Sequence, residues 1–238
     1  MVKKYKKDDK ISYALGATLV MELLNKRPEL AKTVYVSPKC DIDEVVSRAG
    51  ELGVPVEVSE KAINILSPKG NCFAIGLFDK FTASPRADRH HVVLVNPSDS
   101  GNLGTIMRTV AAFDCADLVI IRPAVDPFDP KTVRASMGAV FNISFTEYDS
   151  FDEYIKDYPA HRVVPFMLGG SDFSDIKFLA GENGSEKCTL VFGNEATGLP
   201  AEFTKFGAVK IEQSETVDSL NLSTAVAIAL YKLYTEKY

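Results

Sequence analysis

The run His91-Val92-Val93-Leu94-Val95 constrains the fold of this chain more than any other segment. Its apolar side chains do not alternate with polar ones, so both faces of a strand formed by this run would be buried. Further short apolar runs follow at Leu118–Ile121, Val163–Met167 and Thr189–Phe192, and helical patterns lie among them. Strands that alternate with helices predict an α/β fold with a mainly parallel, doubly wound sheet, which binds ligands at the carboxyl ends of its strands.

The first third of the chain predicts a separate, small α/β domain. Its expected elements are helices over residues 14–25, 41–50 and 59–67, and strands over 33–36, 54–58 and 72–78. The segment Phe81–Arg89 has turn and charge composition without periodicity, which marks a linker. We therefore expect one domain at residues 1–85 and a second at residues 86–238.

The charge of the chain gives no general nucleic-acid signature, because the formal net charge is −5. Residues 1–85 carry 13 Lys and Arg against 11 Asp and Glu, whereas residues 86–238 carry 14 against 21. Contact with RNA would therefore need a local basic patch, and the lysine-rich first ten residues are one candidate. We favour the simpler interpretation of these residues as a solvated, disordered tail.

Membrane, export and metal signals are not found in the sequence. The longest apolar run, Ala225–Leu230, is too short to span a bilayer. No apolar stretch or cleavage site follows the basic N-terminus, so we expect a cytoplasmic protein without an export signal. The histidines lack ligand spacing with any cysteine, so no metal site is expected. The four cysteines are scattered and indicate buried free thiols: Cys40, Cys72, Cys115 and Cys188.

Three polar clusters, each after a short β-branched run, suggest one composite site. The first runs from Asn96 to Gly104 and is followed by Arg108, an arginine suited to phosphate capture. The second, Phe192–Pro200, contains glycines that permit close backbone approach to a ligand. The third, Ser219–Ser223, opens an apolar helical run. Taken singly, the first cluster is better explained as a solvent-facing arginine on an amphipathic helix with an Asn cap. The second is explained equally well as a strand-to-helix turn, and the third as a capped core helix.

The helical run from Thr224 to Tyr234 is apolar on two faces. Leu222 and Val226 lie on one of these faces, and Leu230 and Tyr231 lie on the other. A helix of this kind lies either deep in a core or at a subunit interface.

Together, the clusters resemble the three signature motifs of the SpoU/TrmH branch of the SPOUT RNA ribose methyltransferases. The resemblance covers residues 91–235, and residues 12–80 more weakly resemble the family's substrate-binding domain, which has a ribosomal-protein-like α/β fold. The matching segments are Asn102-Leu103-Gly104-Thr105-Ile106-Met107-Arg108, then Arg134–Ala139, then Phe192-Gly193-Asn194-Glu195 with Gly198-Leu199, and finally Ser219-Leu220-Asn221-Leu222-Ser223.

The resemblance implies a C-terminal trefoil knot that binds S-adenosylmethionine, the methyl donor for a ribose 2′-hydroxyl. The backbone of Gly193, Ile211 and Leu220 matches the positions that hold this cofactor. The family also implies a homodimer that acts on RNA, with no DNA or membrane partner. Ribosomal RNA is favoured over transfer RNA because a separate N-terminal domain is expected.

The resemblance also implies the catalytic residues. Arg108 matches the family's proposed catalytic arginine, which could act as a base or could orient the hydroxyl and the adjacent phosphate. Since the pKa of arginine lies above about 12, the orienting role is chemically simpler. Asn102, Glu195, Ser219 and Asn221 would complete the site.

Three residues depart from the family pattern between Ile211 and Ser219. Glu212, Gln213 and Glu215 stand where proline, methionine and glycine are frequent. The added negative charge motivates an alternative function, a non-catalytic RNA-binding or ribosome-assembly factor that retains the fold. A third interpretation is a general nucleotide-binding α/β enzyme.

Overall fold

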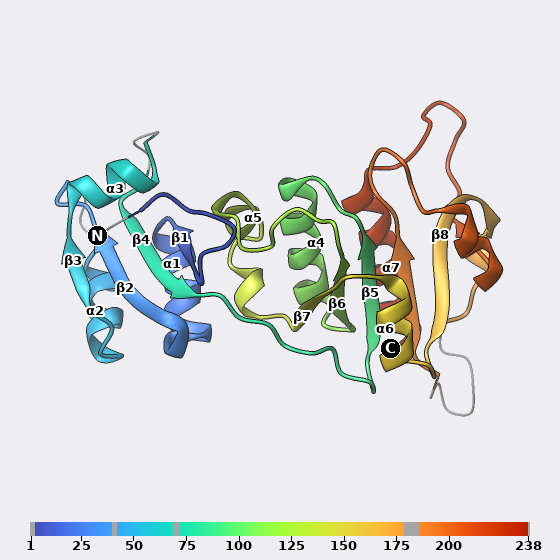
Figure 1. The fold of residues 1–238 in the computed structure, drawn as a ribbon, viewed down its shortest axis with the longest axis horizontal. Helices are drawn as coiled ribbons and strands as arrows, with labels where there is room; N and C mark the ends of the chain where they lie inside the picture. Colours follow the sequence, from blue (N-terminus) through green and yellow to red (C-terminus); the bar gives the residue numbers. More distant parts are fainter. Residues whose placement is uncertain (1–2, 40–41, 69–71, 179–185, 238) are drawn as a thin grey trace. The chain divides into compact units, whose positions relative to one another are not determined.

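The computed structural model describes residues 3–39, 42–68, 72–178 and 186–237, which divide into two compact units (Figure 1). The first unit comprises Met1–Phe81 and Asp126–Asn142, and the second comprises Thr82–Val125 and Ile143–Tyr238. The chain therefore enters the first unit twice. Residues 126–142 pack with residues that lie far earlier in the sequence.

The first unit is built on a four-stranded mixed sheet in the order β1-β4-β2-β3. Strand β4 is antiparallel to β1 and β2, and β2 is parallel to β3. The strands are β1 (Ile11–Leu15), β2 (Ala31–Val36), β3 (Val56–Val58) and β4 (Ala74–Asp79). The helices are α1 (Ala17–Lys26), α2 (Asp43–Glu51), α3 (Glu60–Leu66) and α5 (Pro130–Ala135), with short 3-10 turns η1 (Pro28–Leu30) and η2 (Ala139–Phe141).

Two sequence expectations for the first unit are wrong in detail. Residues 11–15 form a strand, and helix α1 begins only after Gly16, whose φ of 112° breaks the helical pattern expected from Ala14. The sequence also predicts a helix over Lys131–Ala139, but α5 ends at Ala135, because Met137 and Gly138 take left-handed backbone conformations. The helix expected over residues 41–50 is described from Asp43, and residue 41 lies outside the described residues.

The second unit contains a six-stranded sheet in the order β10-β8-β9-β5-β6-β7, and every strand pair in it is parallel. This confirms the expected mainly parallel α/β sheet. The strands are β5 (His90–Val95), β6 (Ala116–Ile121), β7 (Phe145–Tyr148), β8 (Arg162–Asp172), β9 (Cys188–Phe192) and β10 (Val209–Lys210). The helices are α4 (Ser100–Phe113), α6 (Phe151–Asp157) and α7 (Leu222–Lys237), with 3-10 turns η3 (Phe173–Asp175) and η5 (Ala201–Phe206).

Both faces of this sheet are covered. Val93 and Val95 of β5 pack in a cluster with Tyr154 of α6 and Phe203 of η5. Because side chains alternate along a strand, Val92 and Leu94 point to the opposite face, where α4 and α7 pack against each other. The apolar run that begins at His91 is therefore a central strand buried on both sides.

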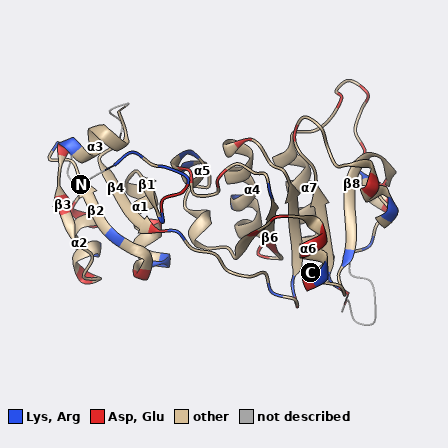
Figure 2. Cartoon of the chain, in the orientation of Figure 1, with Lys and Arg blue, Asp and Glu red and all other residues tan. Residues whose placement is uncertain are grey.

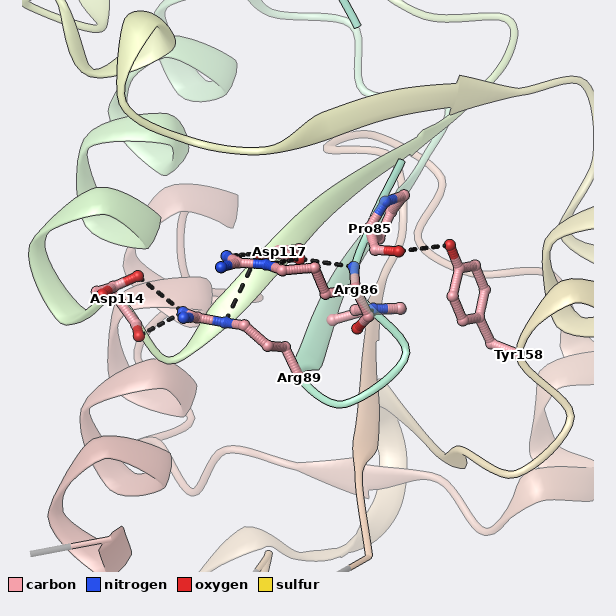
Figure 3. A network of polar contacts seen from close by, with 7 residues as sticks. Pro85, Arg86, Arg89, Asp114, Asp117 and Tyr158 are labelled. Atoms are coloured by element: carbon pink, nitrogen blue, oxygen red, sulfur yellow. Dashed lines mark hydrogen bonds and ion pairs between the residues drawn. The ribbon is translucent and has the colours of Figure 1, made fainter. Parts of the chain in front are cut away.

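The segment expected to be a linker is fastened to the second unit from Thr82 onward. Buried Asp117 accepts hydrogen bonds from the Arg86 backbone N–H at 2.8 Å and from two guanidinium nitrogens of Arg86 at 3.0 and 2.6 Å (Figure 3). Arg89 pairs with Asp114 at 2.8 Å, and the Tyr158 hydroxyl donates to the carbonyl oxygen of Pro85 at 2.8 Å. A buried carboxylate needs such partners, so this segment is held in place.

A buried histidine cluster lies beside this segment. His91 Nδ1 is 2.8 Å from the Tyr154 hydroxyl, which is 2.6 Å from the Thr189 hydroxyl. The His161 and His91 rings lie 4.4 Å apart. His90 Nδ1 accepts a hydrogen bond from the Cys188 backbone N–H at 3.0 Å. These side chains are all buried, so their polar atoms are paired inside the protein.

Three of the four cysteines are described, and all three are buried free thiols: Cys72, Cys115 and Cys188. This confirms the expectation for them, whereas Cys40 lies outside the described residues. Among the described residues, no helix has the length and apolar character needed to cross a membrane, and no cluster of His, Cys, Asp and Glu could hold a metal ion.

Candidate functional site

A cavity of about 630 Å³ lies at the carboxyl ends of the central strands of the second unit. Strand β5 leads into α4 and β6 on one side of the sheet, whereas β9 leads to β10 on the other side. A reversal of this kind creates a crevice between adjacent strands, where doubly wound proteins bind ligands. The lining residues come from β8, from the loops after β9 and β10, and from the start of α7, together with Asn102.

The first polar cluster ends in the first turn of α4. The helix is capped by Asp99, whose carboxylate accepts a hydrogen bond from the Asn102 backbone N–H at 2.7 Å. The side chain of Asn102 is therefore not used as a cap. Its amide nitrogen donates to Glu195 at 3.2 Å, and its amide oxygen accepts from Asn221 at 3.0 Å. Asn102 thus connects all three clusters.

Glu195 joins the second cluster to the first through four hydrogen bonds. One carboxylate oxygen accepts from the backbone N–H and hydroxyl of Ser98 at 3.0 and 2.8 Å. The other accepts from the Asp99 backbone N–H at 3.2 Å and from Asn102. Burial by itself would raise the pKa of Glu195, but hydrogen bonds from its own backbone, from Ser98 and from Asn102 outweigh burial and lower that pKa. Glu195 is therefore held as an ionised acceptor.

The second cluster is a tight turn rather than a loose glycine loop. Asn194 accepts backbone hydrogen bonds from Ala196 and Thr197 through its side-chain oxygen, and its amide donates to the Asn96 carbonyl oxygen at 2.8 Å. A Cβ on Gly193 would lie 2.2 Å from the carbonyl carbon of Gly198. The glycine at position 193 is thus required by its own turn, while Gly193 also lines the cavity.

The third cluster opens α7 and lines the same cavity. Asn221 accepts hydrogen bonds from the backbone N–H and hydroxyl of Ser223 at 2.8 and 2.7 Å, as an N-terminal cap does. Ser219, Leu220 and Ile211 also line the cavity. The capped-helix interpretation and the composite-site interpretation are therefore compatible. The side-chain oxygen of Asn221 caps α7, and its side-chain nitrogen donates to Asn102.

The three residues that depart from the family pattern make contacts within the second unit or face solvent. Glu212 accepts a hydrogen bond from the Ser174 backbone N–H at 3.0 Å, and hydrogen bonding with the side chain and backbone of Ser174 lowers the pKa of Glu212. The side-chain amide of Gln213 donates to the carbonyl oxygens of Val217 and Asp218, immediately before Ser219. Glu215 is exposed.

Arg108 is not among the residues that line the cavity. It lies exposed on α4, between buried Met107 and the partly buried Thr109. Of the residues expected to act together, the structure joins Asn102, Glu195 and Asn221 by hydrogen bonds, and it places Ser219 at the same cavity. Arg108 is not part of this group of cavity-lining residues.

Sequence reasoning missed several residues at this site. Ser98 and Asp99 hold Glu195, although they were part of the first polar cluster. The segment Phe166–Gly169 of β8 lines the cavity, and Leu168 is 66% exposed there. The exposure of Leu168 is a property of the folded chain, so the sequence pattern held no signal for this segment.

The fold and the site define a doubly wound α/β protein with a ligand cavity at the switch point of its parallel sheet. The sequence profile described as the SpoU rRNA Methylase family matches residues 89–231. This match covers more than half of the chain. The chain belongs to the SpoU rRNA methylase family.

Solved structures and curated proteins are similar over different shares of the chain. The AdoMet-bound rRNA methyltransferase from Sinorhizobium meliloti is 30% identical, with a TM-score of 0.80 over 96% of this chain and 88% of that one. The 23S rRNA (uridine(2479)-2′-O)-methyltransferase of Streptomyces viridochromogenes is 28% identical over 94% of this chain and 67% of its own length. A structure described by its 2-OH methylation of C/U34 on tRNA is 31% identical, with a TM-score of 0.57 over 64% of this chain and 98% of that one.

The chain spans only part of some relatives. It covers 26% and 66% of the length of two further curated proteins that it matches.

Proposed function

We propose that this protein transfers a methyl group from S-adenosylmethionine to a ribose 2′-hydroxyl in structured RNA, with ribosomal RNA as the favoured substrate. Membership of the SpoU family supports an RNA methyltransferase that uses this cofactor. The single observation that carries the finer proposal is the hydrogen-bonded chain from Glu195 through Asn102 to Asn221 at the cavity. It unites the three motifs in one site.

The residues around the cavity fit the cofactor. The cavity is large enough for a nucleoside with an amino-acid tail, and its walls include backbone at Gly193, Ile211 and Leu220, which would hold the cofactor. Apolar side chains such as Phe192 and Leu222 line it as well. When bound, S-adenosylmethionine supplies an activated methyl group, so the protein chiefly has to position the acceptor hydroxyl.

The polar residues have distinct roles in this proposal. Asn102, Ser219 and Asn221 orient the ribose beside the cavity, and the ionised Glu195 fixes Asn102. Arg108 is exposed, which suits capture of the phosphate next to the target ribose when RNA binds. Since an arginine remains protonated, it stabilises negative charge there rather than removing the hydroxyl proton.

Ribosomal RNA is favoured by the share of this chain that each relative covers. The two rRNA methyltransferases align with 96% and 94% of it, whereas the structure described for tRNA aligns with 64%. The additional part includes the first unit, to which we assign recognition of the RNA. The proposed domains are an N-terminal substrate-binding domain at residues 1–85, ribosomal-protein-like in fold, and a methyltransferase domain at residues 86–238. Residues 82–85 pack in the second unit and residues 126–142 pack in the first.

A trefoil knot, a homodimer and a cytoplasmic location belong to the same proposal. The exposed Tyr231 and Tyr234 on α7, with Phe113 of α4 beside both rings, support an interface between two copies. Sedimentation of the protein and of a Tyr231→Glu variant tests the dimer. A monomeric wild-type protein would contradict it.

The central experiment uses the purified protein, methyl-labelled S-adenosylmethionine and RNA from cells that lack the protein. We expect label in one ribosomal RNA, resistant to alkaline cleavage at the modified ribose. Transfer to no RNA, including undermodified RNA, would overturn the proposed activity. RNA binding without cofactor binding would favour the non-catalytic assembly factor, and stabilisation by a nicotinamide nucleotide alone would favour a different nucleotide enzyme.

A further inference from the structure

The lysines of residues 3–10 form the strongest concentration of positive charge in the first unit. This segment, Lys3–Lys10, contains five lysines and two aspartates. Residues 1–81 and 126–142 together carry 15 Lys and Arg against 13 Asp and Glu. Outside the segment the unit therefore carries ten against eleven. Figure 2 shows the segment as a run of blue with a short red stretch.

The backbone of this segment is attached to the first unit, so the expected disordered tail is wrong for residues 3–10. The Tyr13 hydroxyl donates to the Lys3 carbonyl oxygen at 2.7 Å. The Lys80 ammonium donates to the Lys7 carbonyl oxygen at 2.6 Å, and the Lys80 backbone N–H donates to the Lys10 carbonyl oxygen at 2.8 Å. Three carbonyl groups of the segment thus accept hydrogen bonds from Tyr13 of β1 and from Lys80, which follows β4.

A tyrosine provides a further anchor in the middle of the segment. The Tyr5 ring packs against the cluster that contains Tyr13, and its hydroxyl donates to Asp126. Lys80 lies over this ring, with its ammonium 4.7 Å from the ring centroid, and pairs with Asp126 at 3.7 Å. The side chains of Lys80 and Asp126 are only 17% and 10% exposed. These contacts are mostly buried, so they are screened little by salt.

The anchors use backbone carbonyls and tyrosines and leave ammonium groups in solvent. Lys3, Lys4, Lys6 and Lys10 are exposed, and none of them forms an ion pair with a residue in the described ranges. Asp9 is partly buried, and its backbone N–H donates to the Lys6 carbonyl oxygen at 3.1 Å. The result is an ordered segment that presents the ammonium groups of Lys3, Lys4, Lys6 and Lys10 to solvent.

We propose that Lys3–Lys10 is a docked phosphate-binding surface for the RNA substrate. Ammonium groups bind backbone phosphates without reading sequence, and a fixed backbone lowers the entropy lost on binding. RNA is favoured over an acidic protein because this inference rests on the proposed RNA methyltransferase activity. In that role the surface positions the substrate, while the cavity of the second unit carries the chemistry.

The test compares two variants that each lose four charges. The first changes Lys3, Lys4, Lys6 and Lys10 to Gln. The control changes four other exposed lysines of the same unit to Gln: Lys26, Lys32, Lys61 and Lys131.

Binding of a labelled ribosomal RNA fragment is followed by fluorescence anisotropy over a range of salt concentrations. For the first variant we expect Kd to rise about tenfold or more and the salt dependence of log Kd to fall by about 3. Smaller changes are expected for the control.

A second pair of measurements separates a docked surface from a loose tail. Tyr13→Phe removes the hydrogen bond to Lys3 and keeps every charge. We expect RNA affinity to fall about two- to fivefold with an unchanged salt dependence, because only preorganisation is lost. Unchanged affinity in Tyr13→Phe would overturn docking, and equal losses in the two four-lysine variants would overturn the assignment to this segment.

Methyl transfer distinguishes failure of this surface from failure of the proposed activity. The four-lysine variant should show a raised KM for RNA, an unchanged kcat and an unchanged Kd for S-adenosylmethionine. Wild-type protein that binds RNA through this segment without methyl transfer would overturn the proposed activity and leave the surface in place. Transfer with an unchanged KM in the variant would overturn the surface alone.

Discussion

The side-chain amide of Asn221 donates a hydrogen bond of 3.0 Å to the side-chain oxygen of Asn102, which lies 119 residues earlier. The same Asn221 caps α7 through its oxygen, and the same Asn102 binds Glu195 through its nitrogen. Each amide is therefore fixed in one orientation by partners on both ends. The three loops share one polar network at the cavity.

Two substitutions at Asn221 separate its two contacts. Asn221→Asp keeps an oxygen for the cap but sets a carboxylate against the Asn102 oxygen, so we expect methyl transfer to fall while the thermal midpoint stays close to wild type. Asn221→Ala loses both contacts and should also lower stability by about 1 kcal/mol. Urea unfolding and initial rates check both variants. Equal stability losses in the two would contradict the capping role.

Glu195→Gln should disrupt the network although the two side chains have nearly the same shape. Glu195 accepts all four of these hydrogen bonds, so the NH2 group of a glutamine at this position would face N–H or O–H donors. We expect a loss of about 1–3 kcal/mol in the free energy of unfolding and a lower kcat. If Gln at this position retained full activity and stability, Glu195 would not be the link between the loops.

Arg108→Ala should reduce methyl transfer by roughly 100-fold or more and leave cofactor binding nearly unchanged. Cofactor binding should be unchanged because Arg108 is exposed on α4 and is not among the residues that line the cavity. Calorimetry with S-adenosylmethionine and rate measurements with saturating RNA check the two quantities separately. Arg108→Lys, which keeps the charge but not the bidentate geometry, should fall between wild type and Ala. Equal loss of cofactor binding and rate would contradict the phosphate role.

Gly193 and Gly169 offer a matched pair at the cavity. A methyl group on Gly193 would meet the backbone of Gly198 at 2.2 Å, whereas one on Gly169 meets nothing within 4 Å. We expect Gly193→Ala to lower the free energy of unfolding by at least about 2 kcal/mol and to weaken cofactor binding. Gly169→Ala should leave stability close to wild type. Thermal unfolding and calorimetry of both variants check this difference.

As the pH is lowered, the free energy of unfolding should begin to decrease before the carboxylates titrate, because two buried histidines resist protonation. Burial lowers the pKa of His90 and of His91 to about 4, from an ordinary value of 6.5. The unfolded chain therefore binds protons that the folded chain excludes, so stability is complete above about pH 6.5 and declines toward about pH 4. Urea unfolding across this range checks the decline.

A histidine variant tests the origin of that pH dependence. His91→Asn should be less stable at neutral pH, since the contacts with Tyr154 and with the Arg86 carbonyl change. Its stability should nevertheless depend less steeply on pH between about 6.5 and about 4. An unchanged slope would place the pH dependence on other groups. Asp117 and Glu195, whose pKa values are lowered from ordinary values of 3.8 and 4.5, act at the lower end of this window and below it.

Much of the second unit could be predicted from the sequence. The apolar run from His91 to Val95, and those at Leu118–Ile121 and Thr189–Phe192, mark buried parallel strands by composition alone. Strands β7 and β1 were not predicted. Strand β7 is short, and the last two residues of β1, Ala14 and Leu15, fell in an expected helix that Gly16 interrupts. Such short segments take their structure from strand pairing, which a local pattern does not contain.

The sequence by itself determined the family, the parallel sheet and the residues that form the three loops, because periodicity and motif wording are local properties. Only the tertiary structure decided that Glu195 holds Ser98 and Asn102, that Arg108 lies outside the cavity, and that Lys3–Lys10 is docked rather than free. Each of these outcomes depends on where residues distant along the chain are placed. The hydrogen bonds and burial that fix them arise only when the strands and helices pack.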